Sequence, residues 1–253
     1  MPRWLAGVLR SVHAFAASGA VRLTYKAERE TVMLGLALED VRDVVAGLTA
    51  ADSAGRLASE RTGEWMYVFK PLVAGQVIYV KIVLAGTAWS CPSTRTRVLV
   101  MKKTSSKNGR TLARGRILPN DACPTCGTLM KEARGRLKLP INGEEITVPS
   151  ASHLTCPKCG EIVLRFQEGK RLHEDAIEIY RKKHGLLSAD EIRAIRERFS
   201  LTQADLARLL RLGANTVSRW ESGRNVQTAA MDMLLRLIRD LPGSIDYLRD
   251  HAA

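Results

Sequence analysis

Four cysteines form the pattern in this chain that most directly suggests chemistry. They lie in two C-x-x-C loops, CPTCG at 123–127 and CPKCG at 156–160, with 29 residues between Cys126 and Cys156. Two thiolates three residues apart in a tight turn can bind one metal ion, and the glycine after each second cysteine lets the backbone turn back toward the sulfurs. We therefore predict one structural Zn²⁺ per chain, held by Cys123, Cys126, Cys156 and Cys159. Two disulfides or four free thiols are the alternatives.

A second candidate site lies in ANTVSRWESG at 214–223. Helical spacing places Val217 and Trp220 on the inward face, so the polar residues near the start of this helix face outward. Asparagine suits the N6/N7 edge of adenine and arginine suits the O6/N7 edge of guanine. The spacing therefore predicts DNA contacts from Asn215, Thr216, Ser218 and Arg219.

The preceding helix supports this interpretation. It follows Thr202, and a tight turn at Leu212–Gly213 separates it from the 214–223 helix. Two short helices joined by a glycine-containing turn are typical of a helix-turn-helix. Gln203, at the positive end of the first helix, could hold a DNA phosphate. The alternative is a small helical bundle that binds protein.

Helix-turn-helix domains usually dimerise on near-palindromic sites, so we expect a homodimer through the last helix and 244–248.

The net charge of +13 is unevenly distributed. Residues 1–120 hold 18 Lys/Arg and 8 Asp/Glu, a balance of +10, whereas residues 121–253 hold 21 and 18, a balance of +3. Such an excess favours a polyanionic partner such as nucleic acid, although solubility alone could also explain it. The larger excess lies in the half without the predicted DNA-binding motif, which suggests either a second activity that faces nucleic acid or contact with an acidic partner surface.

The elements of the N-terminal half indicate an α+β domain, because helices come first and strands follow. Helical periodicity and β-branched runs predict three helices near 4–18, 24–34 and 38–48, then three strands at 64–70, 77–84 and 97–103. Tyr79, Lys81 and Lys102 lie on adjacent predicted strands. The segment 71–76, with Pro71 and Gly75, suits a hairpin connection.

The remaining chain divides by composition. Residues 104–120, rich in Ser, Gly, Pro and basic residues, are interpreted as a basic flexible linker. Residues 121–170 form the cysteine-containing α/β module, in which Asn142-Gly143 between apolar runs predicts a β-hairpin. Residues 171–187 form a connecting helix, and residues 188–253 an all-helical domain that begins with a capping box at Ser188 and Glu191. The chain as a whole is thus predicted to be multidomain α+β.

The N-terminus could be mistaken for a targeting segment. Arg3 and the small residues near Gly19 suggest a secretory signal, but Arg10 and His13 interrupt the apolar stretch. We therefore expect an amphipathic helix there. No apolar run is long enough to span a bilayer, and thiol-based zinc binding fits a reducing compartment, so we expect a cytoplasmic protein without a membrane partner.

The order of cysteine loops, hairpin, connecting helix and LTQADLA…VSRWESG resembles the MqsA antitoxin family over residues 121–253. The last segment alone is similar to phage-repressor-like helix-turn-helix domains. The resemblance implies a zinc domain that binds a toxin and a C-terminal domain that dimerises and binds operator DNA. Under it, the family's base-reading Asn and Arg fall on Asn215 and Arg219, and its zinc ligands on the four cysteines of 123–159.

Residues 1–103 resemble the MqsR toxin family, with KPLVAGQVIYVKI at 70–82 as the most similar segment. The resemblance implies a RelE-like α+β fold and ribosome-independent mRNA cleavage. Attack by a ribose 2′-OH needs a base, an acid for the leaving oxygen and cations for the phosphorane charge. The family's functional Tyr and C-terminal Lys fall on Tyr79 and Lys102. Lys81 lies nearby, and a third basic position falls near Arg56.

Two departures bear on that activity. The family Gln after the strand tryptophan is Met66 here, and the loop at 86–96 is longer. Methionine cannot hydrogen-bond RNA as glutamine does. A solvated sheet edge for the lysines and a packing role for Tyr79 are the alternatives.

Taken together, the two resemblances imply a fused type II toxin–antitoxin protein. Its N-terminal mRNA endoribonuclease would be held inactive by an intramolecular contact with its own zinc-binding module, and its C-terminal domain would repress its own operator. The alternative is a DNA-binding repressor whose N-terminal domain is catalytically inactive or only binds RNA or a ligand.

Overall fold

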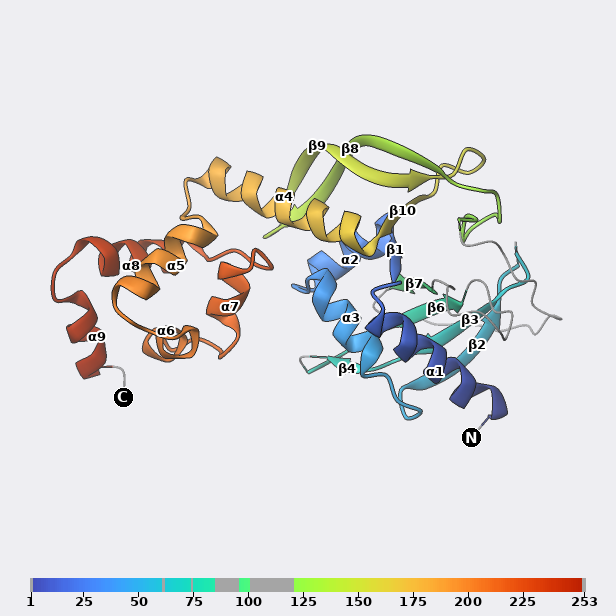
Figure 1. Cartoon of the computed structure of the whole chain (residues 1–253), viewed down its shortest axis with the longest axis horizontal. Coiled ribbons are helices and arrows are strands. Elements are labelled where there is room, and N and C mark those ends of the chain that lie inside the picture. The colour runs from blue at the N-terminus through green and yellow to red at the C-terminus, as the bar shows by residue number, and fades with distance from the viewer. Residues whose placement is uncertain (1, 61, 74, 85–95, 101–120, 252–253) are drawn as a thin grey trace.

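The computed structural model of the chain describes residues 2–60, 62–73, 75–84, 96–100 and 121–251, and is elongated (Figure 1). The predicted linker at 104–120, Lys102 and Cys91 lie outside the described residues. The described part is mixed α and β with several separate cores, in agreement with the predicted α+β class. It contains no helix that is both long and apolar enough to cross a bilayer.

The N-terminal part, residues 2–100, packs helices on one face of an antiparallel sheet (Figure 1). The helices are α1 (Arg3–Ala17), α2 (Tyr25–Met33) and α3 (Leu38–Ala46). The sheet has the order β2-β3-β6-β7, and its strands are β2 (Ser53–Ala58), β3 (Trp65–Phe69), β6 (Val80–Leu84) and β7 (Thr96–Val100). A small hairpin of β4 (Leu72–Val73) and β5 (Gln76–Val77) connects β3 to β6, as Pro71 and Gly75 predicted.

The core of this part forms where the apolar stripes of α1 and α3 meet the sheet. Its members alternate along the strands, so that Phe69, Val80 and Ile82 point toward the helices. Phe166, from the far side of the cysteine module, packs into the same core. The N-terminal part and the cysteine module are therefore joined by apolar packing as well as by the chain.

The cysteine module, residues 121–165, is built on a long hairpin of β8 (Lys131–Ile141) and β9 (Glu144–Thr155). Its two-residue turn is Asn142-Gly143, whose φ angles of 48° and 83° are the left-handed values that this turn requires. The predicted hairpin is confirmed, and it is longer than the sequence pattern indicated. The strand β10 (Ile162–Arg165) pairs with β9.

A strand from the N-terminal part completes this second sheet. β1 (Arg22–Thr24), between α1 and α2, pairs antiparallel with β10 and gives a four-stranded sheet of order β1-β10-β9-β8. Leu23 is fully buried opposite Leu164. The backbone hydrogen bonds of one sheet thus cross between chain segments about 140 residues apart.

The helix α4 (Phe166–His184) runs from this sheet to the C-terminal bundle. Its apolar side packs Leu172, Ala176 and Ile177 against the hairpin, and Val226 from the bundle joins the same core. The buried Arg181 donates hydrogen bonds to the carbonyls of Trp220 (2.9 Å) and Asn225 (3.3 Å), so α4 and the bundle are held together by buried polar contacts as well.

The C-terminal bundle comprises α5 (Ala189–Arg198), α6 (Gln203–Leu209), α7 (Thr216–Glu221), α8 (Ala229–Asp240) and α9 (Ser244–His251). The predicted capping box at its start is confirmed, because Ser188 and Glu191 exchange side chain-to-backbone hydrogen bonds. Thr202 caps α6 in the same manner with Asp205. Leu206, Val217, Trp220, Leu235 and Ile238 fill the bundle's own core.

The seam between the N-terminal part and the cysteine module also contains specific polar contacts. The Tyr25 hydroxyl donates to the Lys138 carbonyl (2.5 Å) and accepts from the Lys138 amide (2.7 Å). Arg29 forms a two-point ion pair with Glu145, and the buried Arg22 of β1 pairs with Asp121 at 2.9 Å. Bidentate arginine–carboxylate pairs have demanding geometry, so these contacts fix one relative orientation.

One carboxyl group in this seam is buried. Glu28 on α2 is 1% exposed, and its Oε2 has no hydrogen-bond partner among the described residues. It lies against Gly169 of α4, where an added Cβ would come within 3.1 Å of Oε2. Burial, with the nearby charge of Glu39 second, raises the pKa of Glu28 to about 7.

This burial predicts a pH dependence of folding stability. Because the pKa of Glu28 is higher in the folded chain, its contribution is complete below its ordinary value of 4.5 and is lost as pH rises through about 7. We expect Glu28→Gln to be more stable than the parent at pH 8 by up to about 3 kcal/mol. Urea unfolding from pH 4.5 to 8 would show the difference growing with pH. A difference that is constant over this range would contradict a buried, protonated Glu28.

Candidate metal centre and nucleic-acid interface

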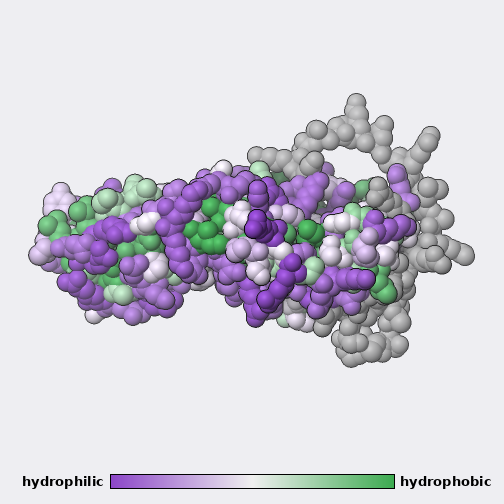
Figure 2. Space-filling model, turned by 90° about the horizontal axis from the view of Figure 1, so that it is seen from above, coloured by the Kyte–Doolittle hydropathy of each residue, from purple (hydrophilic) through white to green (hydrophobic). Residues whose placement is uncertain are grey.

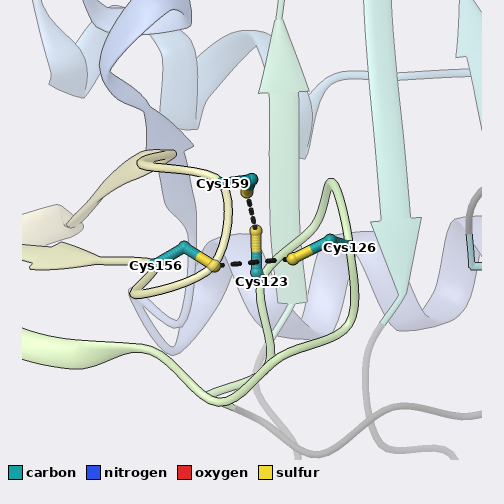
Figure 3. Close-up of side chains that lie close together, drawn as sticks. All are labelled: Cys123, Cys126, Cys156 and Cys159. Carbon is teal, nitrogen blue, oxygen red and sulfur yellow. Dashed lines mark hydrogen bonds between the residues drawn. The ribbon is translucent and has the colours of Figure 1, made fainter.

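The four predicted cysteines come together at one end of the cysteine module (Figure 3). All four sulfurs lie within 4.8 Å of one another, with 3.5 Å between Cys123 and Cys159 and 3.4 Å between Cys126 and Cys156. A tetrahedral zinc–thiolate site with bonds of about 2.3 Å places sulfurs about 3.8 Å apart. All four cysteines are free thiols in the structure, and their clustered sulfurs suit a metal ion.

Each cysteine pair is held by the same local turn. The amides of Gly127 and Gly160 donate to the carbonyls of Cys123 and Cys156 at 2.9 and 3.0 Å, with the glycines at left-handed φ angles of 75° and 72°. The Thr125 amide points at the Cys123 sulfur at 3.4 Å. Thr125 also donates through its hydroxyl to Glu161 of the other loop at 2.8 Å, which ties the two turns together.

The thiols differ in how readily they ionise. Hydrogen bonding with Thr128 lowers the pKa of Cys126 to about 6, whereas burial raises the pKa of Cys123 to about 12. A thiolate is the form that binds metal, so a cation bound first by Cys126 would offset the burial cost of ionising Cys123. The donor set of four sulfurs selects soft or borderline ions such as Zn²⁺.

The predicted recognition segment lies on α7, with its apolar and polar residues divided as expected. Val217 and Trp220 are 0% and 4% exposed, which confirms their inward direction. Asn215 is exposed just before the helix, and Thr216, Ser218 and Arg219 are partly exposed. The structure therefore brings four of the five predicted DNA-contacting residues to one outer surface of the bundle.

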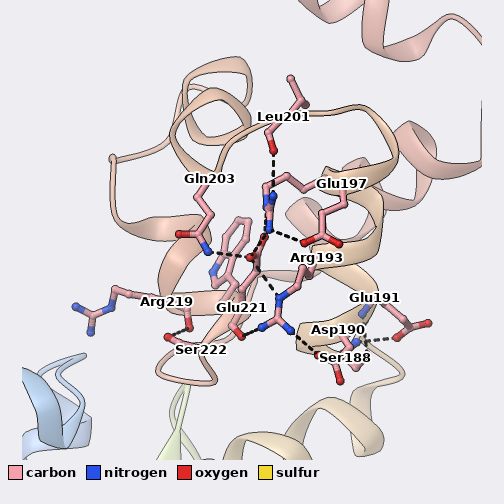
Figure 4. Close-up of polar contacts among 12 residues, drawn as sticks. Ser188, Asp190, Glu191, Arg193, Glu197, Leu201, Gln203, Arg219, Glu221 and Ser222 are labelled. Atoms are coloured by element: carbon pink, nitrogen blue, oxygen red, sulfur yellow. Dashed lines mark hydrogen bonds and ion pairs between the residues drawn. The ribbon is translucent and has the colours of Figure 1, made fainter.

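The fifth, Gln203, is engaged within the bundle (Figure 4). Its amide donates to the buried carboxylate of Glu221 at 2.8 Å, and Arg196 donates to the same carboxylate at 2.6 and 3.0 Å. These contacts hold the pKa of Glu221 below its ordinary value against the effect of burial. The network fixes α6 and α7 relative to α5, so Gln203 positions the predicted recognition helix through Glu221.

Arg219 is occupied by the N-terminal part. Its side chain points away from the Glu221 network (Figure 4), and its guanidinium lies 2.8 Å from a carboxylate oxygen of Asp40. It also donates to the Gly35 carbonyl at 2.9 Å. Sequence reasoning missed Asp40, because its local pattern indicates only a helix-start residue, a role it also fills by accepting from the Ala37 amide.

Neighbouring charges extend this contact. Glu39, next to Asp40 at the start of α3, pairs with Lys170 of α4 at 3.2 Å and with Arg224 after α7 at 4.0 Å. The acidic start of α3 thus meets basic residues from both α4 and the bundle. No short-range sequence pattern marks these pairs, since Asp40 and Arg219 are 179 residues apart.

The residues proposed for RNA chemistry are only partly assembled. Tyr79 and Lys81 share one surface, with the Lys81 ammonium 5.5 Å from the Tyr79 ring centre. Burial raises the pKa of Tyr79, so its phenol stays protonated at neutral pH and suits an acid rather than a base. Lys102 lies outside the described residues.

Arg56 is not brought to them. It pairs across the sheet with Tyr67, which pairs with Ile82, so Arg56 shares the helix-covered face and Lys81 the opposite one. A register shift between Ser53 and Gly55 on β2 sets this direction. The position on the Lys81 face next to Arg56 is Leu57, opposite Met66.

Comparison with known proteins addresses the C-terminal half. The chain matches the family described as the antitoxin component of bacterial toxin-antitoxin systems, MqsA, over residues 121–249. Antitoxin HigA-2 of Vibrio cholerae serotype O1 (strain ATCC 39315 / El Tor Inaba N16961) is 34% identical over 64 residues, which cover 25% of this chain and 62% of that protein. The chain thus spans less than two thirds of the length of that relative.

The family match covers just over half of the chain, and it includes the cysteine cluster, α4 and the bundle, in the order that the sequence indicated. It leaves residues 1–120 outside its range. The chain therefore belongs to the MqsA antitoxin family.

Proposed function

We propose that this protein is a fused toxin–antitoxin protein, in which an MqsR-like mRNA endoribonuclease at residues 1–103 is held inactive by its own antitoxin. The observation that carries the proposal is the shared sheet. The family's cysteine module receives its outermost strand, β1, from the N-terminal part, and the Tyr25, Arg29 and Arg22 contacts surround that strand. An antitoxin fused to an unrelated domain would have no reason to share a sheet with it.

In this proposal the four cysteines hold one structural Zn²⁺, and the bundle is a helix-turn-helix in which α7 reads operator DNA through Asn215, Thr216, Ser218 and Arg219. The chain would then repress its own operon from the cytoplasm, where thiols remain reduced. HigA-2 is itself named an antitoxin, which agrees with this assignment.

We further propose a homodimer through the outer side of α8 and α9. Met233, Leu237 and Leu241, spaced four residues apart, are 60%, 47% and 56% exposed, and Tyr247 of α9 is 65% exposed. Figure 2 shows hydrophobic residues gathered on the surface of the bundle, at the left of the view. A two-fold dimer would present two copies of α7 to a near-palindromic site.

Separate expression of the N-terminal part tests the central proposal. We expect induced residues 1–103 to arrest growth and fragment mRNA, whereas the full-length chain does neither. The double variant Tyr79→Phe/Lys102→Ala in the fragment should remove both effects, because the phenol and the ammonium are assigned to acid catalysis and to the phosphorane charge. A soluble, folded fragment that neither arrests growth nor cleaves RNA would overturn the nuclease assignment.

The second candidate is a repressor whose N-terminal part no longer cleaves RNA. It is favoured by the composition of the sheet face that carries Tyr79 and Lys81. On that face Met66 occupies the position at which the toxin family has glutamine, and Met66 pairs across the sheet with Leu57. Arg56 points to the opposite face. The same fragment experiment separates the two, because this candidate predicts operator binding by the full chain without any RNA cleavage by the fragment.

A further inference from the structure

An aromatic–arginine stack around Arg56 lies on the N-terminal part, away from the cysteine cluster and from the α7 surface. The guanidinium carbon of Arg56 is 4.0 Å from the ring centre of Trp65 and 5.3 Å from that of Trp4. Tyr67 extends the row, with its ring centre 5.4 Å from that of Trp4. The residues come from the amino end of α1 and from the paired strands β2 and β3.

The central arginine of this stack is exposed, and its charge is not neutralised. Across the part of the chain that the structure describes, Arg56 makes no hydrogen bond and no ion pair, while both tryptophans are half-buried. The two indoles hold the guanidinium plane in place, so its five N–H donors are oriented before any ligand arrives. β2 is the terminal strand of its sheet, which leaves the stack accessible from the side.

The stack is also separate from the seam between the N-terminal part and the cysteine module. The seam uses β1 and α2, and the bundle contacts the start of α3. The amino end of α1 instead lies at the far end of the N-terminal part from the bundle (Figure 1). A ligand at the stack would therefore not need to displace the cysteine module.

We propose that Trp4, Arg56 and Trp65 form a stacking platform that binds single-stranded RNA. Half-buried aromatic rings beside an unpaired arginine bind unstacked bases together with the adjoining phosphate. A duplex does not offer unstacked bases at its surface. The balance of +10 over residues 1–120 supplies the attraction for a polyanion. The choice of RNA over single-stranded DNA rests on the proposed nuclease function, whereas the stacking itself does not.

Binding of 2′-O-methyl octauridylate to the full-length protein tests this platform, because that probe lacks the 2′-OH needed for cleavage. We expect Arg56→Ala to weaken binding about tenfold, measured by fluorescence anisotropy. Arg56→Lys should lose most of the same affinity with an unchanged salt dependence, because it keeps the charge and loses the plane. Trp65→Phe should reduce the quenching of tryptophan fluorescence by the probe.

Arg10→Ala is the matched control, since it removes the same charge from an exposed position of α1 outside the stack and should weaken binding at most about twofold. Equal losses in Arg10→Ala and Arg56→Ala, tighter binding of duplex DNA than of the probe, or no binding of the probe would each overturn the platform. Arg56→Lys serves if Arg56→Ala fails to fold. Failure of the platform with an active 1–103 fragment would leave the nuclease proposal intact.

Discussion

Replacement of Cys123 by serine is expected to abolish metal binding and to unfold the knuckle formed by 121–130 and 155–162. Cys123 is fully buried. Its loop is fixed by backbone hydrogen bonds from the Cys123 amide to the Thr128 carbonyl and from the Met130 amide to the Asp121 carbonyl. Structural zinc contributes on the order of 10–16 kcal/mol in small domains of this kind, far more than a cluster with so few apolar residues can supply. Zinc content measured on purified protein should fall from one per chain to near zero.

The effect should extend to the N-terminal part. Asp121, at the start of the knuckle, pairs with Arg22 of β1, and β10 follows the second cysteine loop and pairs with β1. Loss of the metal should therefore increase hydrogen exchange in β1, and in cells it should unmask the proposed toxicity.

Cys91→Ser is the matched control, because Cys91 belongs to neither C-x-x-C loop, and it should leave zinc content and exchange unchanged. A Cys123→Ser protein that keeps its zinc would contradict the four-thiolate site. One that loses zinc and folds, yet stays harmless while residues 1–103 alone arrest growth, would show that the cysteine module is not the restraining element.

The second large effect concerns Arg219 and Asp40, whose substitutions should change operator affinity in opposite directions. Arg219→Ala removes a candidate bidentate contact to guanine and should weaken operator binding about ten- to hundredfold. Asp40→Asn removes the carboxylate that now holds Arg219 and should tighten operator binding about three- to tenfold, because the arginine is then free in a larger fraction of molecules. Gel-shift titration at fixed salt would measure both.

Asparagine at position 40 keeps an acceptor for the Ala37 amide, so the start of α3 is preserved. Asp43→Asn is the matched control, since Asp43 is exposed on the same helix and pairs only with its neighbour Arg42 among the described residues. An Asp40→Asn protein that binds the operator no better than Asp43→Asn would show that the ion pair does not compete with DNA. Unchanged affinity in Arg219→Ala would remove α7 as the recognition helix.

Features that depend on short-range patterns could be predicted from the sequence. The two cysteine loops, the Asn142-Gly143 hairpin, the capping box at Ser188 and the inward direction of Val217 and Trp220 all depend on residues within a few positions of one another. In each case the local chemistry restricts the backbone strongly enough that distant contacts do not change the outcome.

Features that depend on partners distant in the sequence could not be predicted from it. Three residues, Arg22–Thr24, have no strand pattern of their own and become a strand because β10 lies beside them. The direction of Arg56 depends on the register shift near Gly55, which reverses the face of every later residue on β2. The engagement of Arg219 by Asp40 depends on how the bundle docks on α3, which neither local sequence indicates.

The strand exchange between β1 and β10 also has a consequence for turnover. If a protease cuts the chain between residues 101 and 120, the two pieces remain a nicked complex, joined by a continuous sheet, by Phe166 in the N-terminal core and by the Arg22, Arg29 and Arg219 ion pairs. Dissociation then becomes a slow unfolding event. Under the proposed function, a cell that needs the N-terminal part free must degrade the C-terminal half, and the lifetime of that half would set the delay before activation.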